Sequence, residues 1–65
     1  MIEKYVGVLG AGSFGTVIAN ILAENNMVLL YARRPEVIEE MRTTRKRGGY
    51  HLHQNVVPVD ELEYL

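Results

Sequence analysis

Three glycines stand close together near the start of the chain, in the segment GVLGAGSFGTVIANIL. Gly10, Gly12 and Gly15 fit the pattern G-x-G-x-x-G, in which each glycine has its own physical task. The first allows a tight turn, the second leaves room for a diphosphate to approach the backbone, and the third lets a helix pack closely on a strand. Free N–H groups at the start of that helix attract the phosphates. The pattern predicts a dinucleotide site, and the alternative is that the glycines serve packing alone.

Two arginines, Arg33 and Arg34, stand where such sites distinguish NAD from NADP. An acidic residue about 20 residues beyond the glycines binds the ribose 2′-hydroxyl of NAD, whereas arginine binds the 2′-phosphate of NADP. Residues 30–34 read LYARR and contain no acid. Because guanidinium groups make charge-assisted bonds to phosphate, we expect NADPH as the cofactor, with NADH as the alternative. A second interpretation is that both arginines are solvated charges that pair with Glu36 or Glu39.

Other polar residues carry weaker signals. His51 and His53 would share one face of an extended segment, but no third ligand stands nearby, so we expect surface histidines and no metal site. The basic segment RTTRKR, residues 42–47, is interpreted as a solvated loop, or as a rim that assists a phosphate ligand, rather than as a nucleic-acid contact. The hydroxyls of Ser13 and Thr16 suit capping or phosphate contact, because nothing beside them would activate a nucleophile.

The hydrophobic pattern predicts the elements that position these residues. A nearly continuous apolar run at 5–9 indicates a strand over 4–9 that is covered on both faces, and apolar residues at helical spacing then predict a helix over about 13–24. Residues 27–31 form a second apolar strand, parallel to the first through a right-handed crossover. Pro35 suits the first position of a second helix that ends near 42–44.

The rest of the chain has less regular patterning. Residues 43–54 show no sustained period and are interpreted as a loop, and residues 55–59 are interpreted as a third strand, with Pro58 at its end or on an edge of the sheet. Asp60 with Glu63 resembles a capping box at the start of a further helix. The fold class is therefore α/β, a partial Rossmann-type doubly wound parallel sheet with the order β-α-β-α-β, truncated.

The size and composition of the chain set limits on its partners. It has 65 residues, of which 48% are hydrophobic and 23% charged, and it has no cysteine, so a globular core without disulfides is expected. The net charge of −1 gives no bias toward nucleic acid or membranes, and neither is expected as a partner. No signal peptide or membrane span is recognised, which favours a cytoplasmic location. Residues 1–65 are expected to form the N-terminal part of a dinucleotide-binding domain, with no complete second domain.

The segments VLGAGSFGTVIANILAENN, LLYARRPEVIEEM and TTR occur in this order. Together they resemble the amino-terminal part of bacterial NAD(P)H-dependent glycerol-3-phosphate dehydrogenase, and the resemblance runs over essentially the whole chain. It implies an oxidoreductase that reduces dihydroxyacetone phosphate to sn-glycerol 3-phosphate and so supplies phospholipid biosynthesis in the cytoplasm. The family's catalytic lysine and its pocket for the phosphorylated triose substrate lie in later sequence. The chain alone is therefore expected to be a cofactor-binding fragment without activity.

The resemblance also assigns residues by position. Ser13 and Phe14 would contact the cofactor phosphates, Arg33 and Arg34 would hold the adenosine 2′-phosphate end, and Tyr50 would lie close to it. Family members often have Trp in place of Phe14, and here KRGGY replaces an Asn-Pro loop before the aromatic residue. The candidate cofactor-binding residues are Gly10, Gly12, Ser13, Phe14, Gly15, Arg33, Arg34 and Tyr50, with no catalytic residue assigned.

Two alternatives remain open at this point. One is a non-catalytic nucleotide-binding or self-associating module, and the other is the N-terminus of a different Rossmann dehydrogenase such as ketopantoate reductase. Self-association is expected in either case, because a truncated parallel sheet leaves open strand edges and apolar faces. Exchange of the segment after Gly49 is one route to it.

Overall fold

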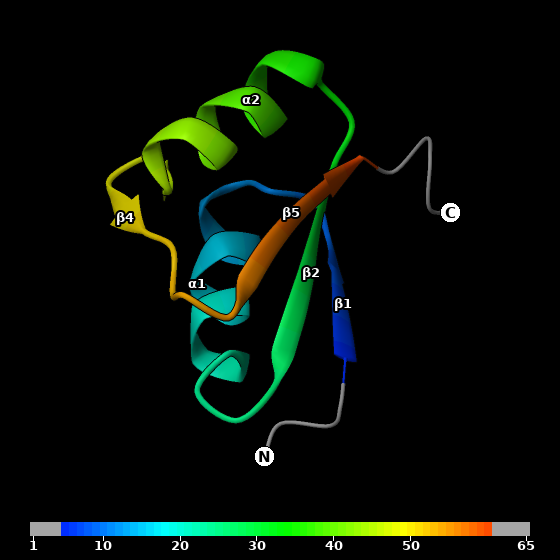
Figure 1. Ribbon diagram of the computed structural model, residues 1–65, viewed down its shortest axis with the longest axis vertical. Helices are drawn as coiled ribbons and strands as arrows, with labels where there is room; N and C mark the ends of the chain where they lie inside the picture. The colour runs from blue at the N-terminus through cyan, green and yellow to red at the C-terminus, as the bar shows by residue number, and fades with distance from the viewer. Residues whose placement is uncertain (1–4, 61–65) are drawn as a thin grey trace.

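The computed structural model describes residues 5–60. Within this range the elements are β1 (Tyr5–Leu9), α1 (Ser13–Leu22), β2 (Met27–Ala32), α2 (Pro35–Thr44), β3 (Lys46–Arg47), β4 (Tyr50–His51) and β5 (Val56–Asp60). β1, β2 and β5 form a parallel sheet in the order β1-β2-β5, and α1 and α2 lie in the two crossovers (Figure 1). The expected partial Rossmann-type α/β fold is confirmed.

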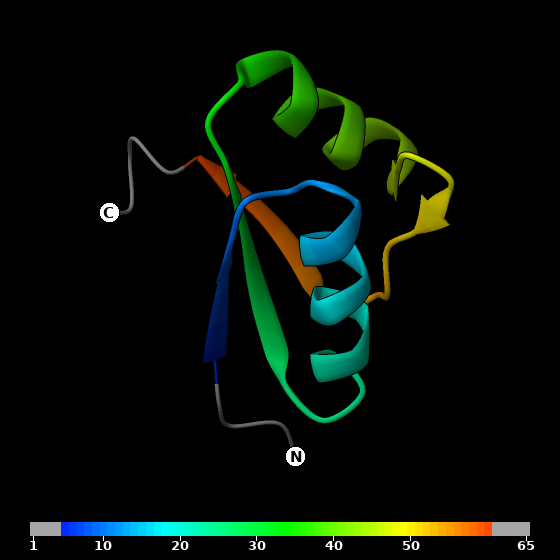
Figure 2. The ribbon, with the colours of Figure 1, turned by 180° about the vertical axis from the view of Figure 1, so that it is seen from behind.

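The core lies on one face of this sheet. Val28, Leu30 and Ala32 of the central strand β2 alternate with less buried neighbours, as a period of two requires. Both helices contribute to the same cluster, with Ala19 and Ala23 from α1 and Ile38 and Met41 from α2. Figure 2 shows α1 in front of the sheet on this side. Full burial of a side chain such as Leu30 contributes about 1.5–3 kcal/mol.

The opposite face of the sheet is open, which corrects the prediction that the strands are covered on both faces. Tyr5 and Leu9 of β1 are 71% and 63% exposed. Their register partners, Met27 and Tyr31, point to the same side, because paired residues of parallel strands share a face. Apolar residues on both sides of a strand indicate two covering layers. Within residues 5–60, however, both helices pack on one side, and the second layer is absent from this range.

Several element boundaries differ from the predictions. α1 ends at Leu22 rather than at Glu24. The N–H of Glu24 donates to the carbonyl of Ile21 at 3.3 Å, and that of Asn25 to Leu22 at 3.2 Å, so the chain tightens into bonds three residues apart. β2 extends one residue further than predicted, to Ala32, whereas α2 begins at Pro35 and ends at Thr44 as predicted. Residue 4, the expected start of the first strand, lies outside the described residues.

The segment 43–54 is not a simple loop, so that prediction is wrong. β3 and β4 form an antiparallel hairpin in which Arg47 pairs with Tyr50, and Gly48 and Gly49 make the turn between them. Gly48 has φ +62°, a value that favours glycine in a two-residue hairpin turn. Strands of two residues are too short to produce a periodic hydrophobic pattern. The Gly48–Gly49 pair was therefore the feature of the sequence that could have indicated a hairpin.

β5 stands at an end of the sheet order, as Pro58 had suggested. Pro58 lies within this strand, opposite Leu30, and an edge strand tolerates a residue without an N–H. Asp60 is the last residue of β5, and the helix expected after it lies outside the described residues. Neither of the helices in residues 5–60 is long and apolar enough to cross a membrane.

Candidate functional site

The glycine turn joins β1 to α1 at the carboxyl end of the sheet. Gly10 has φ +91°, a backbone conformation that a side chain would strain, and its N–H donates to the carbonyl of Tyr31 at 3.1 Å. A Cβ atom on Gly15 would overlap the carbonyl oxygen of Gly10, so the helix approaches the turn too closely for any side chain there. A Cβ atom on Gly12 would instead point into open space, with no atom within 4 Å. Gly12 therefore leaves the surface of the turn bare.

The first turn of α1 offers unpaired donors at this bare surface. Gly12 is the N-cap residue, no side chain within residues 5–60 caps the helix, and its first turn contains no acidic residue. The Thr16 hydroxyl does not point outward, since it is buried and donates to the carbonyl of Gly12 at 2.8 Å. The N–H groups of the first turn and the positive end of the helix dipole are thus available to an anion.

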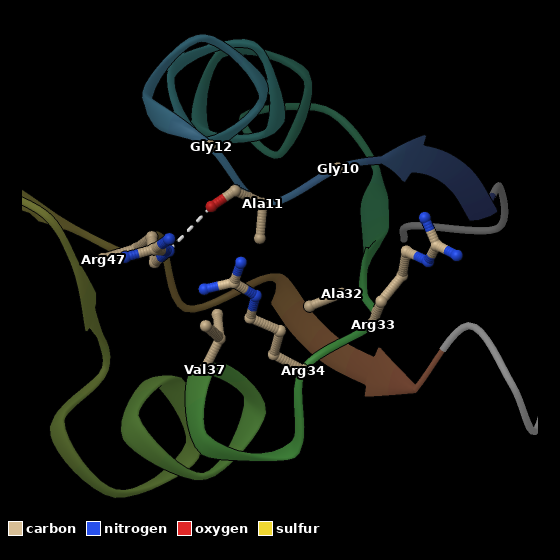
Figure 3. Close-up of a pocket in the computed structure, with 8 residues that line it drawn as sticks. All are labelled: Gly10, Ala11, Gly12, Ala32, Arg33, Arg34, Val37 and Arg47. Atoms are coloured by element: carbon tan, nitrogen blue, oxygen red, sulfur yellow. Dashed lines mark hydrogen bonds between the residues drawn. The ribbon is translucent and has the colours of Figure 1, made fainter.

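A pocket of about 210 Å³ opens between the glycine turn and the start of α2 (Figure 3). It lies outside the carboxyl ends of β1 and β2, the place where open α/β sheets bind ligands. The residues that line it are Gly10, Ala11, Gly12, Ala32, Arg33, Arg34, Val37 and Arg47. The lining thus combines bare backbone and small apolar side chains with three arginine residues.

The charge of the pocket is positive. Arg33, Arg34 and Arg47 contribute cations, and no carboxylate lines the cavity. Within the described residues neither the guanidinium of Arg33 nor that of Arg34 has a hydrogen-bond or ion-pair partner, so the interpretation that they pair with Glu36 or Glu39 is not supported. Figure 3 shows the guanidinium of Arg34 pointing toward the glycine turn, whereas that of Arg33 extends to the other side of β2. Clustered cations of this kind attract a phosphorylated ligand.

Four of the predicted site residues meet in this pocket and four do not line it. Gly10, Gly12, Arg33 and Arg34 line it as expected from their spacing. Gly15 is in contact with the rear of the turn. Ser13 and Phe14 begin α1 beside it, where Phe14 is 81% exposed, and Tyr50 lies in β4 with 45% of its surface exposed. For all eight residues a role in binding stays a prediction.

Four lining residues were not among the predicted site residues, and Arg47 is the most informative of them, because the basic segment 42–47 was interpreted only as a solvated loop or as a rim for a phosphate ligand. Its Nε–H donates to the carbonyl oxygen of Ala11 at 2.7 Å, a contact between residues 36 positions apart in the chain. Nothing in a presumed loop indicates such a contact, and only recognition of the Gly48–Gly49 hairpin turn would have fixed where this side chain lies. Ala11, Ala32 and Val37 are small or apolar, and their types alone carry no binding signal.

The two histidines form hydrogen bonds within the fold. The Nδ1 atom of His53 accepts a hydrogen bond from the N–H of Asn55 at 3.0 Å, and the carbonyl of His51 accepts one from the side chain of Asn20 at 2.8 Å. In the part of the chain that the structure describes, no three His, Cys, Asp or Glu residues come together as metal ligands.

Residues 5–64 match the family described as NAD-dependent glycerol-3-phosphate dehydrogenase N-terminus. A Pseudomonas aeruginosa protein named glycerol-3-phosphate dehydrogenase (NAD(P)+) is 48% identical over 66 residues, which cover 94% of this chain and 19% of that protein. A protein of the same name from Methanothermobacter thermautotrophicus is 55% identical over 47 residues, covering 71% of this chain and 15% of that protein.

A third relative of that name, from Pseudomonas putida, is 47% identical over 65 residues, covering 92% of this chain and 19% of its own length. No solved structure gives a significant match. The chain thus spans about a fifth or less of the length of these relatives. By the extent of the family match and the identity of these relatives, this chain belongs to the NAD-dependent glycerol-3-phosphate dehydrogenase N-terminus family.

Proposed function

We propose that this chain binds NADPH and forms the cofactor-binding N-terminal part of an enzyme that reduces dihydroxyacetone phosphate to sn-glycerol 3-phosphate. The observation that carries the proposal is the pocket itself, in which the uncapped start of α1 and the bare Gly12 face the guanidinium groups of Arg34 and Arg47. Membership of the family supports a nicotinamide dinucleotide as the ligand. The choice of NADPH over NADH is the finer part of the proposal.

The residues of the chain suit the two ends of the adenosine half of this cofactor. The diphosphate would accept hydrogen bonds from the first-turn N–H groups of α1 beside Gly12, where a side chain would block it. The absence of an acidic residue among those that line the pocket removes the usual partner of a ribose 2′-hydroxyl. Arg34, which points toward the glycine turn, would instead bind a 2′-phosphate. The cofactor, when bound, supplies the hydride.

We also propose a division of labour, in which this chain binds the cofactor and the rest of such an enzyme carries the catalytic residue and the substrate pocket. The chain spans 19% of the Pseudomonas aeruginosa relative, and we assign the catalytic lysine and the triose phosphate pocket to the remaining part. A partial cofactor site cannot orient a hydride donor against an acceptor, so the chain alone would be inactive. The cytoplasm and the supply of phospholipid biosynthesis are the setting that this activity implies.

A self-associating nucleotide-binding module is the second candidate, and one observation favours it. The open sheet face carries Tyr5 and Leu9, both well over half exposed, and a second copy would bury them. Self-association is compatible with cofactor binding, since the pocket lies at the carboxyl end of the sheet and not on this face.

Binding and turnover by the full 65-residue chain test the proposal. We expect the fluorescence of NADPH to rise on titration with the chain, and no NADPH oxidation when dihydroxyacetone phosphate is added. Absence of binding to either NADPH or NADH would refute the cofactor site. Turnover by the 65-residue chain would refute the division of labour but leave the site intact.

A further inference from the structure

We propose that Arg47 determines the preference for a 2′-phosphorylated cofactor, using one edge of its guanidinium to hold the glycine turn and the other to bind the phosphate. The proposal rests on the function proposed above and assigns to the β3–β4 hairpin a part in recognising the ligand. The sequence analysis assigned the 2′-phosphate to Arg33 and Arg34, with Tyr50 close by, and gave the basic segment 42–47 at most an assisting role without naming a residue.

The hairpin directs Arg47 into the pocket. Arg47 is half-buried and lines the cavity, whereas its neighbour Lys46 is exposed and does not line it. The two residues stand on opposite sides of β3, because successive side chains of a strand alternate. The segment therefore offers two adjacent cations in different environments, of which only Arg47 faces the candidate ligand.

The side chain of Arg47 is anchored before any ligand arrives. Its Nε–H donates to the carbonyl oxygen of Ala11 at 2.7 Å, within the glycine turn (Figure 3). A guanidinium has five N–H donors in a rigid planar fork, so four remain on its two Nη atoms. No described residue accepts from them. A side chain already fixed at Nε loses less conformational entropy when it binds a phosphate than a free one does.

The charge of the 2′-phosphate is large enough to engage more than one guanidinium group. A phosphate monoester carries about −1.5 to −2 charges at pH 7 and three acceptor oxygens. Arg34 lies across the pocket from Arg47, between α2 and the glycine turn, while Arg33 extends away from both (Figure 3). Arg34 and Arg47 would therefore contribute donors from two sides, which one guanidinium cannot do.

A purely structural role for Arg47 makes a different prediction. If this residue only positioned the carbonyl of Ala11, its loss would weaken every ligand that uses the glycine turn by the same factor. If it binds the 2′-phosphate, its loss weakens the phosphorylated ligand more. The ratio of two dissociation constants distinguishes the roles.

The experiment compares 2′-phospho-ADP-ribose with ADP-ribose, two probes that differ only in the 2′-phosphate, by isothermal titration calorimetry on the full chain. We expect the unmodified protein to prefer the phosphorylated probe, and Arg47→Gln to reduce that preference by about tenfold, equivalent to about 1.4 kcal/mol. Gln retains a donor for the carbonyl of Ala11. Lys46→Gln removes the same charge one residue away and should leave the preference unchanged within twofold.

Far-UV circular dichroism checks that each variant folds. If Arg47→Gln does not, Arg47→Lys takes its place: an ammonium is a point charge that cannot reach both partners as the fork does, so the preference should fall at least threefold. An unchanged ratio in the folded variant, or an equal fall in affinity for both probes, would overturn the proposal. So would an equal effect of Lys46→Gln. Failure of the unmodified protein to bind either probe would overturn the proposed function itself.

Discussion

The same substitution at two glycines of one turn should give opposite results. Gly15→Ala places a Cβ atom in overlap with the carbonyl oxygen of Gly10, a backbone atom that cannot rotate away. Such overpacking costs about 1–3 kcal/mol, and the severity of this overlap places it at the upper end. The better helix propensity of alanine returns about 0.5–1 kcal/mol. The free energy of unfolding should therefore fall by about 2 kcal/mol, estimated from these opposing contributions.

Gly12→Ala provides the matched control. A Cβ atom there meets nothing within 4 Å, and the residue has an ordinary φ of −80°. We expect the free energy of unfolding to stay within about 0.5 kcal/mol, because alanine is a poorer N-cap but restricts the unfolded chain. Affinity for NADPH should nevertheless fall at least about tenfold, since the new methyl group occupies the diphosphate position.

Urea unfolding followed by far-UV circular dichroism measures the first effect, and NADPH fluorescence titration the second. The chain has no tryptophan, so the cofactor signal is read without that interference. The reasoning would be refuted if Gly15→Ala left stability unchanged, because the close approach of helix and turn would then be absent. Unchanged NADPH affinity in Gly12→Ala would refute the placement of the diphosphate.

Three further predictions concern the fold that carries the site. Asn20→Ala removes two hydrogen bonds, one donated to the carbonyl of His51 and one accepted from the N–H of His53. It should lower the free energy of unfolding by about 1–2 kcal/mol in urea titrations. Asn20→Asp keeps the acceptor, so its free energy of unfolding should lie closer to that of the unmodified protein. Leu30→Ala, at a fully buried position, should cost about 2–5 kcal/mol in the same assay. Leu9→Gln on the open face should shift sedimentation velocity profiles toward the monomer without changing NADPH affinity, and an unaltered profile would contradict self-association through this face.

The elements with a clear hydrophobic pattern could be predicted from the sequence. β2 was predicted from its continuous apolar run, and α2 begins at Pro35 and ends at Thr44 as its pattern indicated. The glycine turn was predictable for a different reason, since Gly10 and Gly15 meet steric demands that other residues fail. In both cases the constraint acts between residues close together in the chain, so the residue types of that segment reveal it.

Features that depend on distant segments could not be predicted in this way. The bond from Arg47 to Ala11 requires the hairpin to return beside α1, and a two-residue strand has no periodicity from which to infer that path. The apolar residues of β1 indicated coverage on both faces, but hydrophobicity identifies a need for burial and does not say which segment provides it. The sequence thus identified the glycine turn and offered the basic segment 42–47 as a rim for a phosphate ligand, but it could not say that Arg47 is the side chain that reaches the turn.

Arg45 ends α2 in a left-handed conformation, with φ 57°, and its Nη2 atom donates to the carbonyls of His53 and Val56 at 2.9 and 2.8 Å. These bonds fix the residues on either side of the β3–β4 hairpin, and Asn20 of α1 adds hydrogen bonds to the backbone of His51 and His53. Changes in length at the Gly48–Gly49 tip would leave these anchor points in place while altering the reach of the basic rim. On the proposed binding mode, such changes in hairpin length would alter the preference between NADPH and NADH without disturbing the glycine turn.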